Sequence, residues 1–399
     1  MSGLISVDQA ISLILEHRPK MDAETVPLHQ ALGRTLAAPL VAKLTQPPAS
    51  VSAMDGYAVR LADVSEPGAN LKVIGDAPAG APFSGTLGSN EAVRIFTGGH
   101  VPTGADHILI QETVTRDGDV ITCDKAYANA EHIRAAGRDF SKDDSLLETG
   151  KRLGPAEISV AAAANHAELS VLRQPTVGLI SNGNELKPPS SELLQGEIVN
   201  SNPYGLGALV QIWGGKLLPA QHAADSVDAI LEALEALSPA DIIVPIGGAS
   251  VGDHDHMRRA FVEAGFNSVF EKIAVKPGKP TWFSKRSDQS ALGLPGNPAS
   301  AFVCAHLFLR ILMGASEGLE LASGQLAAPL PANGRRETFM RAEAKLNDGG
   351  VVTLHPAIDQ DSSLITPFLG SNALIRRIPQ AEPKGTSSII EFLRIGAES

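Results

Sequence analysis

The chain contains 399 residues, enough for about two to four domains of ordinary size and a sizeable hydrophobic core. Its 33 lysine and arginine residues against 44 aspartate and glutamate residues give a net charge of −11, which argues against general binding to nucleic acid or to anionic membranes. The two cysteines, Cys123 and Cys304, belong to no Cys/His cluster, so neither a disulfide framework nor a structural zinc site is indicated.

The first residues do not resemble a targeting signal. Residues 1–20 carry Asp8, Glu16 and His17 within an apolar pattern, and they lack the basic start and uninterrupted apolar core of a signal peptide. No apolar run reaches about 18 residues, the length that a membrane span requires. We therefore expect a cytoplasmic protein without a membrane partner.

Helical patterns flank a β-rich module in the first half of the chain. Residues 7–19 place apolar side chains on one broad face and end at a proline, which predicts an amphipathic helix. A short helix is expected at 28–32, and helical spacing returns at 154–166. Between them, residues 44–147 consist of short β-branched runs separated by Gly, Pro and Asp turns, which is typical of an all-β module. The β module is therefore expected to be inserted into a helical linker domain.

From residue 175 onward, strand patterns alternate with helix patterns, including a strand expected at 268–278. Repeated strand–helix units predict a doubly wound, mostly parallel sheet covered by helices on both faces. Residues 326–399 return to short β runs, which predict a small barrel-like β domain. The expected fold is thus α/β plus β, in four parts: a helical linker domain (1–43 with 148–174), an inserted β domain (44–147), an α/β domain (175–325) and a C-terminal β domain (326–399).

In parallel sheets of this kind, ligands bind off the carboxyl ends of the strands. This rule nominates four loops, those after Ile180, Ile246, Val275 and Leu294. The first loop, residues 181–185, offers two amides and a carboxylate, or simply a capping segment.

The second nominated loop, residues 247–256, reads "GGASVGDHDH". Its glycines let backbone N–H groups approach an anion, while the carboxylates of Asp253 and Asp255 suit a hard divalent cation. The alternative is an ordinary helix start capped by Asp253. His254 and His256 lack a further ligand in this pattern and are expected on the solvated surface.

The third and fourth loops combine proline, glycine and cationic or polar residues. "KPGKP", residues 276–280, sets two lysines on one rigid turn, which suits a phosphate or an oxyanion, although a solvated hairpin would look similar. "GLPGNPASAFV", residues 293–303, places a rigid turn before a helix expected at 299–312. This turn is either an anion site at the helix start or an ordinary turn with Asn297 as N-cap and Pro298 at the first helical position.

The β module contributes a cluster of its own. "SAMDGYAVR", residues 52–60, sets Asp55 on a turn, beside "RIFTGGHVPTGAD" at 94–106 and "AAGRDF" with Asp139. Asp-Gly turns that serve only as hairpins would look the same.

These motifs, together with "GDAPAG", occur in an order and at separations that resemble the molybdopterin molybdenumtransferase family, which is shared with the E domain of gephyrin. The resemblance runs from about residue 5 to the C-terminus. It implies an enzyme with an inserted β domain, a molybdopterin-binding α/β domain and a C-terminal β domain. It also implies an elongated homodimer in which the inserted domain of one subunit faces the α/β domain of the other.

The family reaction inserts molybdenum from molybdate into adenylylated molybdopterin, with Mg²⁺-dependent loss of AMP. The resemblance therefore implies Mg²⁺ as cofactor, and adenylylated molybdopterin and molybdate as substrates. Glycine turns, lysines and carboxylates suit such chemistry, because two anions and a divalent cation have to be positioned together.

Matching the motifs position by position implies roles for individual residues. The residues that would bear on catalysis are Asp55, Thr97, Asp139, Glu185, Asp225 and Asp255, and the metal would be held by Asp55, Glu185 and Asp255. The residues that would contact phosphate or oxyanion, or shape the pocket, are Gly247, Gly248, Ser250, Lys272, Lys276, Lys279, Pro295, Asn297, Pro298, Arg335 and Arg336.

The chain departs from the family pattern at three positions. Asn182 and Asn184 stand where relatives usually have a threonine and an aspartate, and Ile246 stands where they usually have Thr or Ser. The changes at Asn184 and Ile246 favour an alternative in which the protein is a scaffold that binds molybdopterin or a protein partner without turnover. A second alternative is a different nucleotide- or phosphosugar-handling enzyme, which would leave the β-module motifs unexplained.

Overall fold

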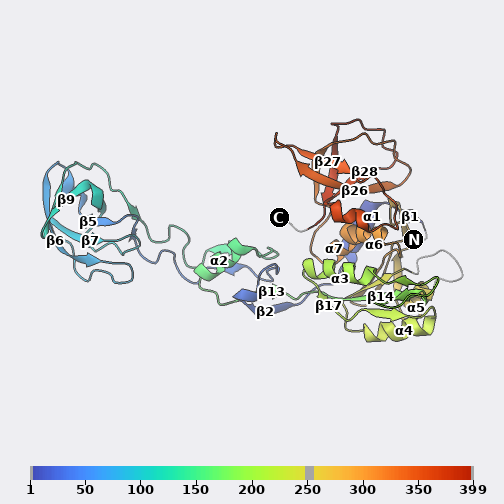
Figure 1. Cartoon of the computed structure of the whole chain (residues 1–399). Helices are drawn as coiled ribbons and strands as arrows, with labels where there is room; N and C mark the ends of the chain where they lie inside the picture. The colour runs from blue at the N-terminus through green and yellow to red at the C-terminus, as the bar shows by residue number, and fades with distance from the viewer. Residues whose placement is uncertain (1–2, 248–255, 397–399) are drawn as a thin grey trace. The chain divides into compact units, whose positions relative to one another are not determined.

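The computed structural model describes residues 3–247 and 256–396, and the chain forms two compact units. The larger unit comprises Met1–Asp22 and Arg173–Ser399, and the second unit comprises Ala23–Leu172. Figure 1 shows both units with their helices and strands labelled. Among the residues described, none of the helices has the length and apolar character needed to cross a bilayer.

A six-stranded mixed sheet dominates the Ala23–Leu172 unit (Figure 1). Its strands, in spatial order, are β8 (His107–Ile110), β5 (Gly56–Val59), β7 (Glu91–Ile95), β6 (Ala69–Ala77), β10 (Val120–Cys123) and β9 (Val114–Asp117). Shorter pairs join β4 (Val51–Ser52) to β11 (Ile133–Arg134), β3 (Leu40–Val41) to β12 (Ser145–Leu147), and β2 (Ala23–Pro27) to β13 (Glu168–Leu172). The six-stranded sheet lies within 44–147 and confirms the predicted inserted β module, whereas β2, β3 and β13 fall in the stretches expected to form a helical linker.

The helices expected in the first half are present, with one difference. α1 (Val7–His17) begins with a capping box, in which Ser6 and Gln9 satisfy each other's backbone N–H groups. α2 (Pro155–Ala163) starts with a proline in its first turn, as predicted. The helix expected at 28–32 is only a single 3₁₀ turn, η1 (Leu28–Gln30). The segment between Pro27 and Gly33 is too short for a helix to propagate beyond one turn.

The larger unit contains the predicted α/β sheet. In spatial order its strands are β17 (Lys216–Leu217), β14 (Thr176–Asn182), β19 (Ile242–Ile246), β24 (Gln289–Gly293), β23 (Trp282–Arg286) and β20 (Asn267–Phe270), and β18 (Gln221–Ala223) also pairs with β14. The pairs around β14 and β19 are parallel, whereas β23 runs antiparallel to its neighbours. The mostly parallel α/β arrangement is confirmed.

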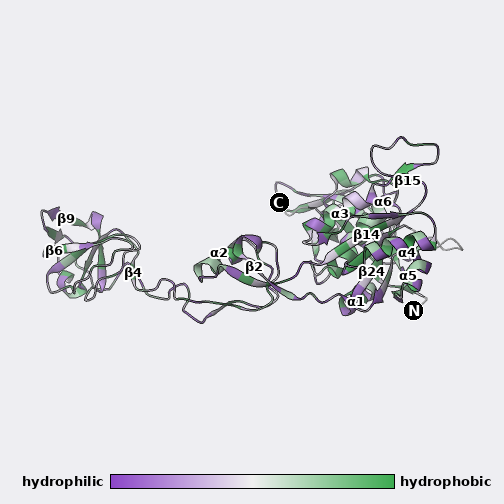
Figure 2. Cartoon of the chain, turned by 90° about the horizontal axis from the view of Figure 1, so that it is seen from below, coloured by the Kyte–Doolittle hydropathy of each residue, from purple (hydrophilic) through white to green (hydrophobic). Residues whose placement is uncertain are grey.

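Helices cover both faces of this sheet (Figure 1). α3 (Asn202–Ile212) packs its Leu206 and Val210 in the same cluster as Val177 and Leu179 of β14. α4 (Val227–Ala236) and α5 (His256–Glu263) pack on the other face. Figure 2 shows hydrophobic residues along β14 and β24. Burial on both faces accounts for the continuous apolar runs in these strands.

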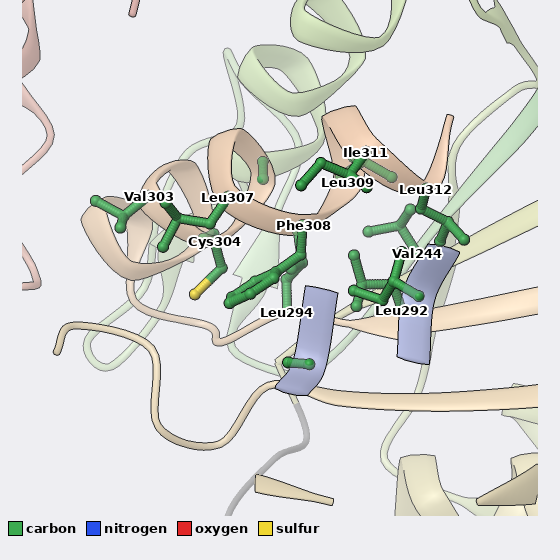
Figure 3. Packing of buried hydrophobic residues seen from close by; sticks show 14 of the residues in the cluster. Val244, Leu292, Leu294, Val303, Cys304, Leu307, Phe308, Leu309, Ile311 and Leu312 are labelled. Atoms are coloured by element: carbon green, nitrogen blue, oxygen red, sulfur yellow. The ribbon is translucent and has the colours of Figure 1, made fainter. Parts of the chain in front are cut away.

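The closing helix lies against the middle of the sheet. It consists of α6 (Pro298–Cys304), a π-helical segment η4 (Ala305–Leu309) and α7 (Arg310–Leu312), which confirms the helix expected at 299–312. Phe308 and its neighbours face Val244, Leu292 and Leu294 of the sheet (Figure 3). Because the helix is buried almost throughout, the start of α6 holds a fixed position beside the strand ends.

The C-terminal residues form the predicted barrel-like sheet. Its strands, in spatial order, are β22 (Val275–Lys276), β26 (Glu337–Leu346), β27 (Val352–Pro356), β25 (Leu321–Leu326), β29 (Ile389–Arg394) and β28 (Ala373–Arg377). An additional pairing of β26 with β28 closes five of these strands into a ring.

The single strand expected at 268–278 is wrong. Three short strands occupy this stretch, each in a different sheet: β20 pairs with β23, β21 (Lys272–Ile273) with β1 (Leu4–Ile5), and β22 with β26. The loop after Val275 therefore does not follow a strand of the α/β sheet. It enters the C-terminal sheet, because the partner of β22 comes from that domain.

Candidate functional site

A cavity of about 760 Å³ in the larger unit lies between the turn that follows β22 and the C-terminal β domain. Its charged lining residues are Lys276, Lys279, Arg336, Arg377, Asp359 and Asp361. We call it the cationic cavity, because four cations outnumber two carboxylates. In the described part of the chain, none of these four cations forms an ion pair. Such an uncompensated positive field, in a chain of net charge −11, suits an anionic ligand.

Arg377 is the most buried of these cations, with only 3 % of its surface exposed. Its Nη2 donates to the carbonyl oxygens of Pro331 and Glu382 at 2.9 and 2.7 Å, whereas its Nη1 is buried and has no partner among the described residues. Burial lowers the pKa of the Arg377 guanidinium. Because an arginine stays protonated even so, Arg377 keeps a positive charge next to the cavity.

One wall of the cationic cavity is a loop of the C-terminal domain, residues 359–364. Arg341, which is only 2 % exposed, holds this loop by donating to the carbonyl oxygens of Asp359, Asp361 and Leu364 at 3.1, 2.8 and 2.6 Å. Hydrogen bonds from a charged guanidinium to carbonyl oxygens are stronger than hydrogen bonds between neutral groups. The loop is therefore fixed by the interior of its own domain.

The same loop is hydrogen-bonded to the first residues of α6. Asn297 Nδ2 donates to Ser362 Oγ at 3.0 Å, and the Ala299 N–H donates to the Ser362 carbonyl at 3.1 Å. Asn297 is the N-cap and Pro298 the first helical residue, as one interpretation of the sequence had it, but the Asn297 side chain makes no capping hydrogen bond. The Ala299 N–H, which was a candidate anion donor, is thus already used by a protein carbonyl.

A second cavity of about 760 Å³ lies at the carboxyl ends of β14, β19 and β24, and we call it the strand-tip cavity. Among its lining residues are Asn182, Glu185, Asn202, Ile246, Gly247, Gly296, Pro298 and Ser363. It shares Pro280, Pro295 and Asn297 with the cationic cavity. The loops nominated after Ile180, Ile246 and Leu294 therefore meet at one place, and the lysine-bearing turn adjoins them.

Asp225 lies beside this strand tip and is held at both carboxylate oxygens. Asn182 Nδ2 donates to Asp225 Oδ1 at 2.8 Å, and the Asn184 N–H donates to Oδ2 at 3.1 Å. Asn184 Oδ1 accepts from the Asp225 N–H at 3.4 Å. Both amides that depart from the family pattern are thus hydrogen-bonded to Asp225.

Two amide oxygens of the strand-tip cavity have no partner in the described part of the chain. Asn182 Oδ1 and Asn202 Oδ1 are buried without a hydrogen bond from any described residue, while Asn202 Nδ2 donates to the Gly296 carbonyl at 2.7 Å. The carboxylate of Glu185 lines the same cavity. Oxygens of this kind are suitable ligands for a hard cation. The described residues contain no cluster of three His, Cys, Asp or Glu side chains arranged for a metal ion.

In the Ala23–Leu172 unit, Asp55 and Thr97 are brought together. Asp55 Oδ1 accepts from the Thr97 N–H at 2.7 Å and from Thr97 Oγ1 at 2.8 Å. These two hydrogen bonds, with a smaller contribution from the positive charge of Arg94, lower the pKa of Asp55. Arg94 stacks on Phe96, with its guanidinium carbon 4.8 Å from the ring centroid. Asp139 belongs to the same unit, where its N–H donates to the Gln46 carbonyl.

Two further predicted residues fall outside these cavities. Lys272 lies in β21, and neither Lys272 nor Arg335 lines either cavity. Gly248, Ser250 and Asp255, with Asp253, lie outside the described residues. Asn202, Ser362 and Arg377 were not anticipated. Arg377 carried a signal, because β28 ends in two arginines directly after three apolar residues, and an arginine that continues a buried strand requires a specific partner.

Comparison with known proteins identifies the family. Residues 5–165 match the "MoeA N-terminal region (domain I and II)", residues 180–314 the "Probable molybdopterin binding domain", and residues 323–387 the "MoeA C-terminal region (domain IV)". A molybdopterin molybdenumtransferase of Haemophilus influenzae is 32% identical over 381 residues, which cover 93% of this chain and 94% of the relative. The chain belongs to the molybdopterin molybdenumtransferase family.

Other relatives of the family agree. A molybdopterin molybdenumtransferase of a Nostoc species is 33% identical over 362 residues, with coverage of 86% of this chain and 83% of the relative. The crystal structure titled as a molybdopterin biosynthesis moeA protein from Pyrococcus horikoshii superposes with a TM-score of 0.84 at 26% identity, covering 98% of this chain and all of that one. The resemblance and the fold class expected from the sequence are confirmed. The protein is an enzyme of this family, with a role in molybdenum cofactor biosynthesis.

Proposed function

We propose that this family member inserts molybdenum from molybdate into adenylylated molybdopterin and releases AMP. The observation that supports this reaction best is the cationic cavity, where four cations without an ion pair to any described residue adjoin the strand tips of the molybdopterin-binding domain. An oxyanion such as molybdate needs fixed positive groups, and a chain of negative net charge must supply them locally.

Lys276, Lys279 and Arg336 are proposed to hold molybdate in this cavity. The two lysines are exposed on one Pro-Gly turn, and Arg336 is steadied by a 3.3 Å hydrogen bond from its Nη1 to the Val275 carbonyl. A planar guanidinium presents parallel N–H groups to an oxyanion, and lysines add mobile point charges. Holding the anion in one place lowers the entropic cost of bringing it to the pterin.

The strand-tip cavity is proposed to hold the adenylylated pterin. Its shared residues Pro280, Pro295 and Asn297 separate it from the cationic cavity by a single layer of side chains, so that ligands in the two cavities would be neighbours. Gly247, with φ of +86°, gives its loop a conformation that other residues rarely adopt. Gly248, Ser250 and Pro298 are proposed to complete this site, and Asp225, which lies beside the cavity, is proposed to act on turnover.

Magnesium is proposed to bind at the strand tip. The carboxylate of Glu185 and the amide oxygen of Asn202, to which no described residue donates, fit its preference for oxygen ligands, with substrate phosphates completing the coordination. Asp55 and Asp255 remain further candidate ligands. When bound, Mg²⁺ would neutralise the phosphate charge that AMP carries away.

We also propose a cytoplasmic homodimer, in which Asp55, Thr97 and Asp139 of one subunit serve the cavities of the other. Mixing two inactive variants, Asp55→Ala and Lys276→Ala, tests this arrangement. Subunit exchange would then create one site with both residues intact, and about a quarter to a half of wild-type activity should return. Activity that stays at the level of the separate variants after demonstrated exchange would contradict a shared site.

The reaction itself is tested with purified protein, adenylylated molybdopterin, molybdate and Mg²⁺. We expect release of AMP together with an equal amount of molybdenum bound to the pterin, measured by chromatography and elemental analysis. Omission of molybdate or Mg²⁺ should abolish the molybdenum-loaded product. Tight binding of the pterin without AMP release would favour the scaffold alternative.

A further inference from the structure

Asn182 occupies a position that links the strand tip to an acidic side chain from another loop. It is the last residue of β14, and Asp225 lies in the loop between β18 and α4. The two residues are 43 positions apart in sequence, yet their side chains are joined by the 2.8 Å hydrogen bond from Nδ2 to Oδ1. The contact therefore fixes one loop relative to the other.

The hydrogen bonds leave little freedom to the Asp225 carboxylate. Oδ2 accepts from the backbone N–H of Asn184, and Oδ1 accepts from Asn182. No other side chain among the described residues donates to either oxygen. Asn182 is therefore the side chain that decides whether the carboxylate stays in this orientation.

The chemistry also fixes the orientation of the Asn182 amide. An ionised carboxylate accepts hydrogen bonds and cannot donate them, so the NH₂ group must face Asp225. The amide oxygen of Asn182 then has no partner among the described residues. Asn182 is one of the residues that line the strand-tip cavity. One side chain thus contacts both the cavity and Asp225.

We infer that Asn182 is a positioning residue that sets the Asp225 carboxylate beside the strand-tip cavity. This inference rests on the proposed function, in which Asp225 bears on turnover. A threonine at this position, as the family pattern has it, would also offer a donor to Asp225. The amide therefore replaces the hydroxyl without loss of the hydrogen-bond donor, and the departure is compatible with full activity.

Three substitutions separate a positioning role from a structural one. Asn182→Ala removes the donor, Asn182→Asp keeps the shape but places a second carboxylate at the contact, and Asn182→Thr restores a donor. Because Asp225 itself lines neither cavity, we expect kcat to fall while KM changes by less than about threefold. The expected losses in kcat are on the order of 10-fold to 100-fold for Asn182→Ala, larger for Asn182→Asp, and smaller for Asn182→Thr.

A double-mutant cycle asks whether Asn182 acts through Asp225. In an Asp225→Asn background, Asn182→Ala should have almost no further effect on kcat/KM, because the carboxylate to be positioned is gone. Equal losses in both backgrounds would overturn the inference.

A matched control and a structural readout complete the test. Asn70→Ala removes another asparagine whose side chain shares a 2.8 Å hydrogen bond, with Thr122, and it should leave kcat unchanged. A crystal structure of Asn182→Ala should show the Asp225 carboxylate rotated away from the Asn184 N–H or in two conformers. An unmoved Asp225 would overturn the inference even if the wild-type protein released no AMP, whereas missing wild-type turnover alone would contradict only the proposed reaction.

Discussion

Asn297 and Ser362 join the start of α6 to the C-terminal β domain through a 3.0 Å hydrogen bond between their side chains. The neighbouring Ala299 N–H donates to the Ser362 carbonyl at 3.1 Å, so the contact survives in part when the hydroxyl is removed. The wall of the cationic cavity is thus attached to the helix that packs over the α/β sheet.

Ser362→Ala should loosen this attachment. Loss of one side-chain hydrogen bond is expected to lower the free energy of unfolding by about 1 kcal/mol, measured by urea denaturation. Molybdate affinity, measured by calorimetry, should fall modestly, because the backbone bond to Ala299 remains. A cavity wall that does not depend on this contact would give wild-type values for both measurements.

The lysines of the cationic cavity should govern anion affinity. Lys276→Ala and Lys279→Ala are each expected to weaken molybdate binding about 10-fold or more, since hydrogen bonds to charged groups contribute about 1.5–3 kcal/mol. Lys345→Ala is the matched control, because that lysine is already paired with Glu343 at 2.9 Å. Affinity should also fall as salt rises. Equal affinities for all three variants would place the anion elsewhere.

Gly278 tolerates no side chain. Its φ is +113°, and a Cβ built there would lie 2.1 Å from the buried Cys304 Sγ. Gly278→Ala should therefore unfold the protein at lower urea concentration, with a loss of more than about 2 kcal/mol. Gly334→Ala provides the comparison in the same cavity, since nothing lies within 4 Å of its Cβ position. Similar stabilities for the two variants would contradict this account.

Asp241 should make the protein sensitive to acid. Burial raises the pKa of this carboxyl. Hydrogen bonds from Arg173, at 2.7 and 2.8 Å, and from the Thr176 N–H lower the pKa by more than burial raises it, so the pKa lies below its ordinary value of 3.8. A lowered pKa in the folded state contributes stability above pH 3.8, and this contribution is lost as the pH falls through the lowered value.

Asp241→Asn removes that titration. The variant should melt at a lower temperature than the wild type at pH 7, and the difference between the two should shrink toward pH 3. Melting curves recorded across this range by circular dichroism provide the test. A constant difference would mean that the Asp241–Arg173 pair does not contribute to the acid sensitivity.

Thr97 should set the pH at which Asp55 becomes ionised. Thr97→Ala leaves the backbone hydrogen bond but removes the side-chain one, so the pKa of Asp55 should rise toward its ordinary value. If the reaction requires ionised Asp55, the acid limb of the kcat/KM profile of Thr97→Ala lies at higher pH than that of the wild type. Thr97→Ser keeps the hydroxyl and should retain the wild-type profile. An unchanged acid limb in Thr97→Ala would remove Asp55 from the acid-sensitive step.

Hydrophobic periodicity in the sequence was sufficient to predict most helices and the α/β sheet. The apolar face of residues 7–19 and the strand–helix alternation after residue 175 are local signals, and the structure confirms both. The prediction of a single strand at 268–278 was wrong for a physical reason. Its three short strands pair with residues 4–5, 283–285 and 337–338, and no local pattern encodes such distant partners.

The residues of the candidate site also divide into those that local sequence patterns could predict and those that depend on distant partners. The rule for strand ends brought Glu185, Gly247 and Pro295 into one cavity, because parallel strands end at a common edge. Arg377 and Ser362 could not be found by this rule, since they come from a different domain and reach the cavity only through tertiary packing. The pairing of Asn182 with Asp225 was also hidden, because an amide at a strand end gives no indication of which loop it meets.

The pairing of β22 with β26 sets a limit on how this architecture can be recombined. Val275 and Lys276 belong by sequence to the α/β region, but they extend the C-terminal sheet through Glu337 and Thr338. A chimera that exchanged only residues 326–399 with a homologue would keep a foreign edge strand against the new sheet and would put the register of the lysine turn at risk. Grafts that carry the 275–280 segment along with the C-terminal residues should preserve anion affinity, so this segment is the natural crossover point for hybrid enzymes.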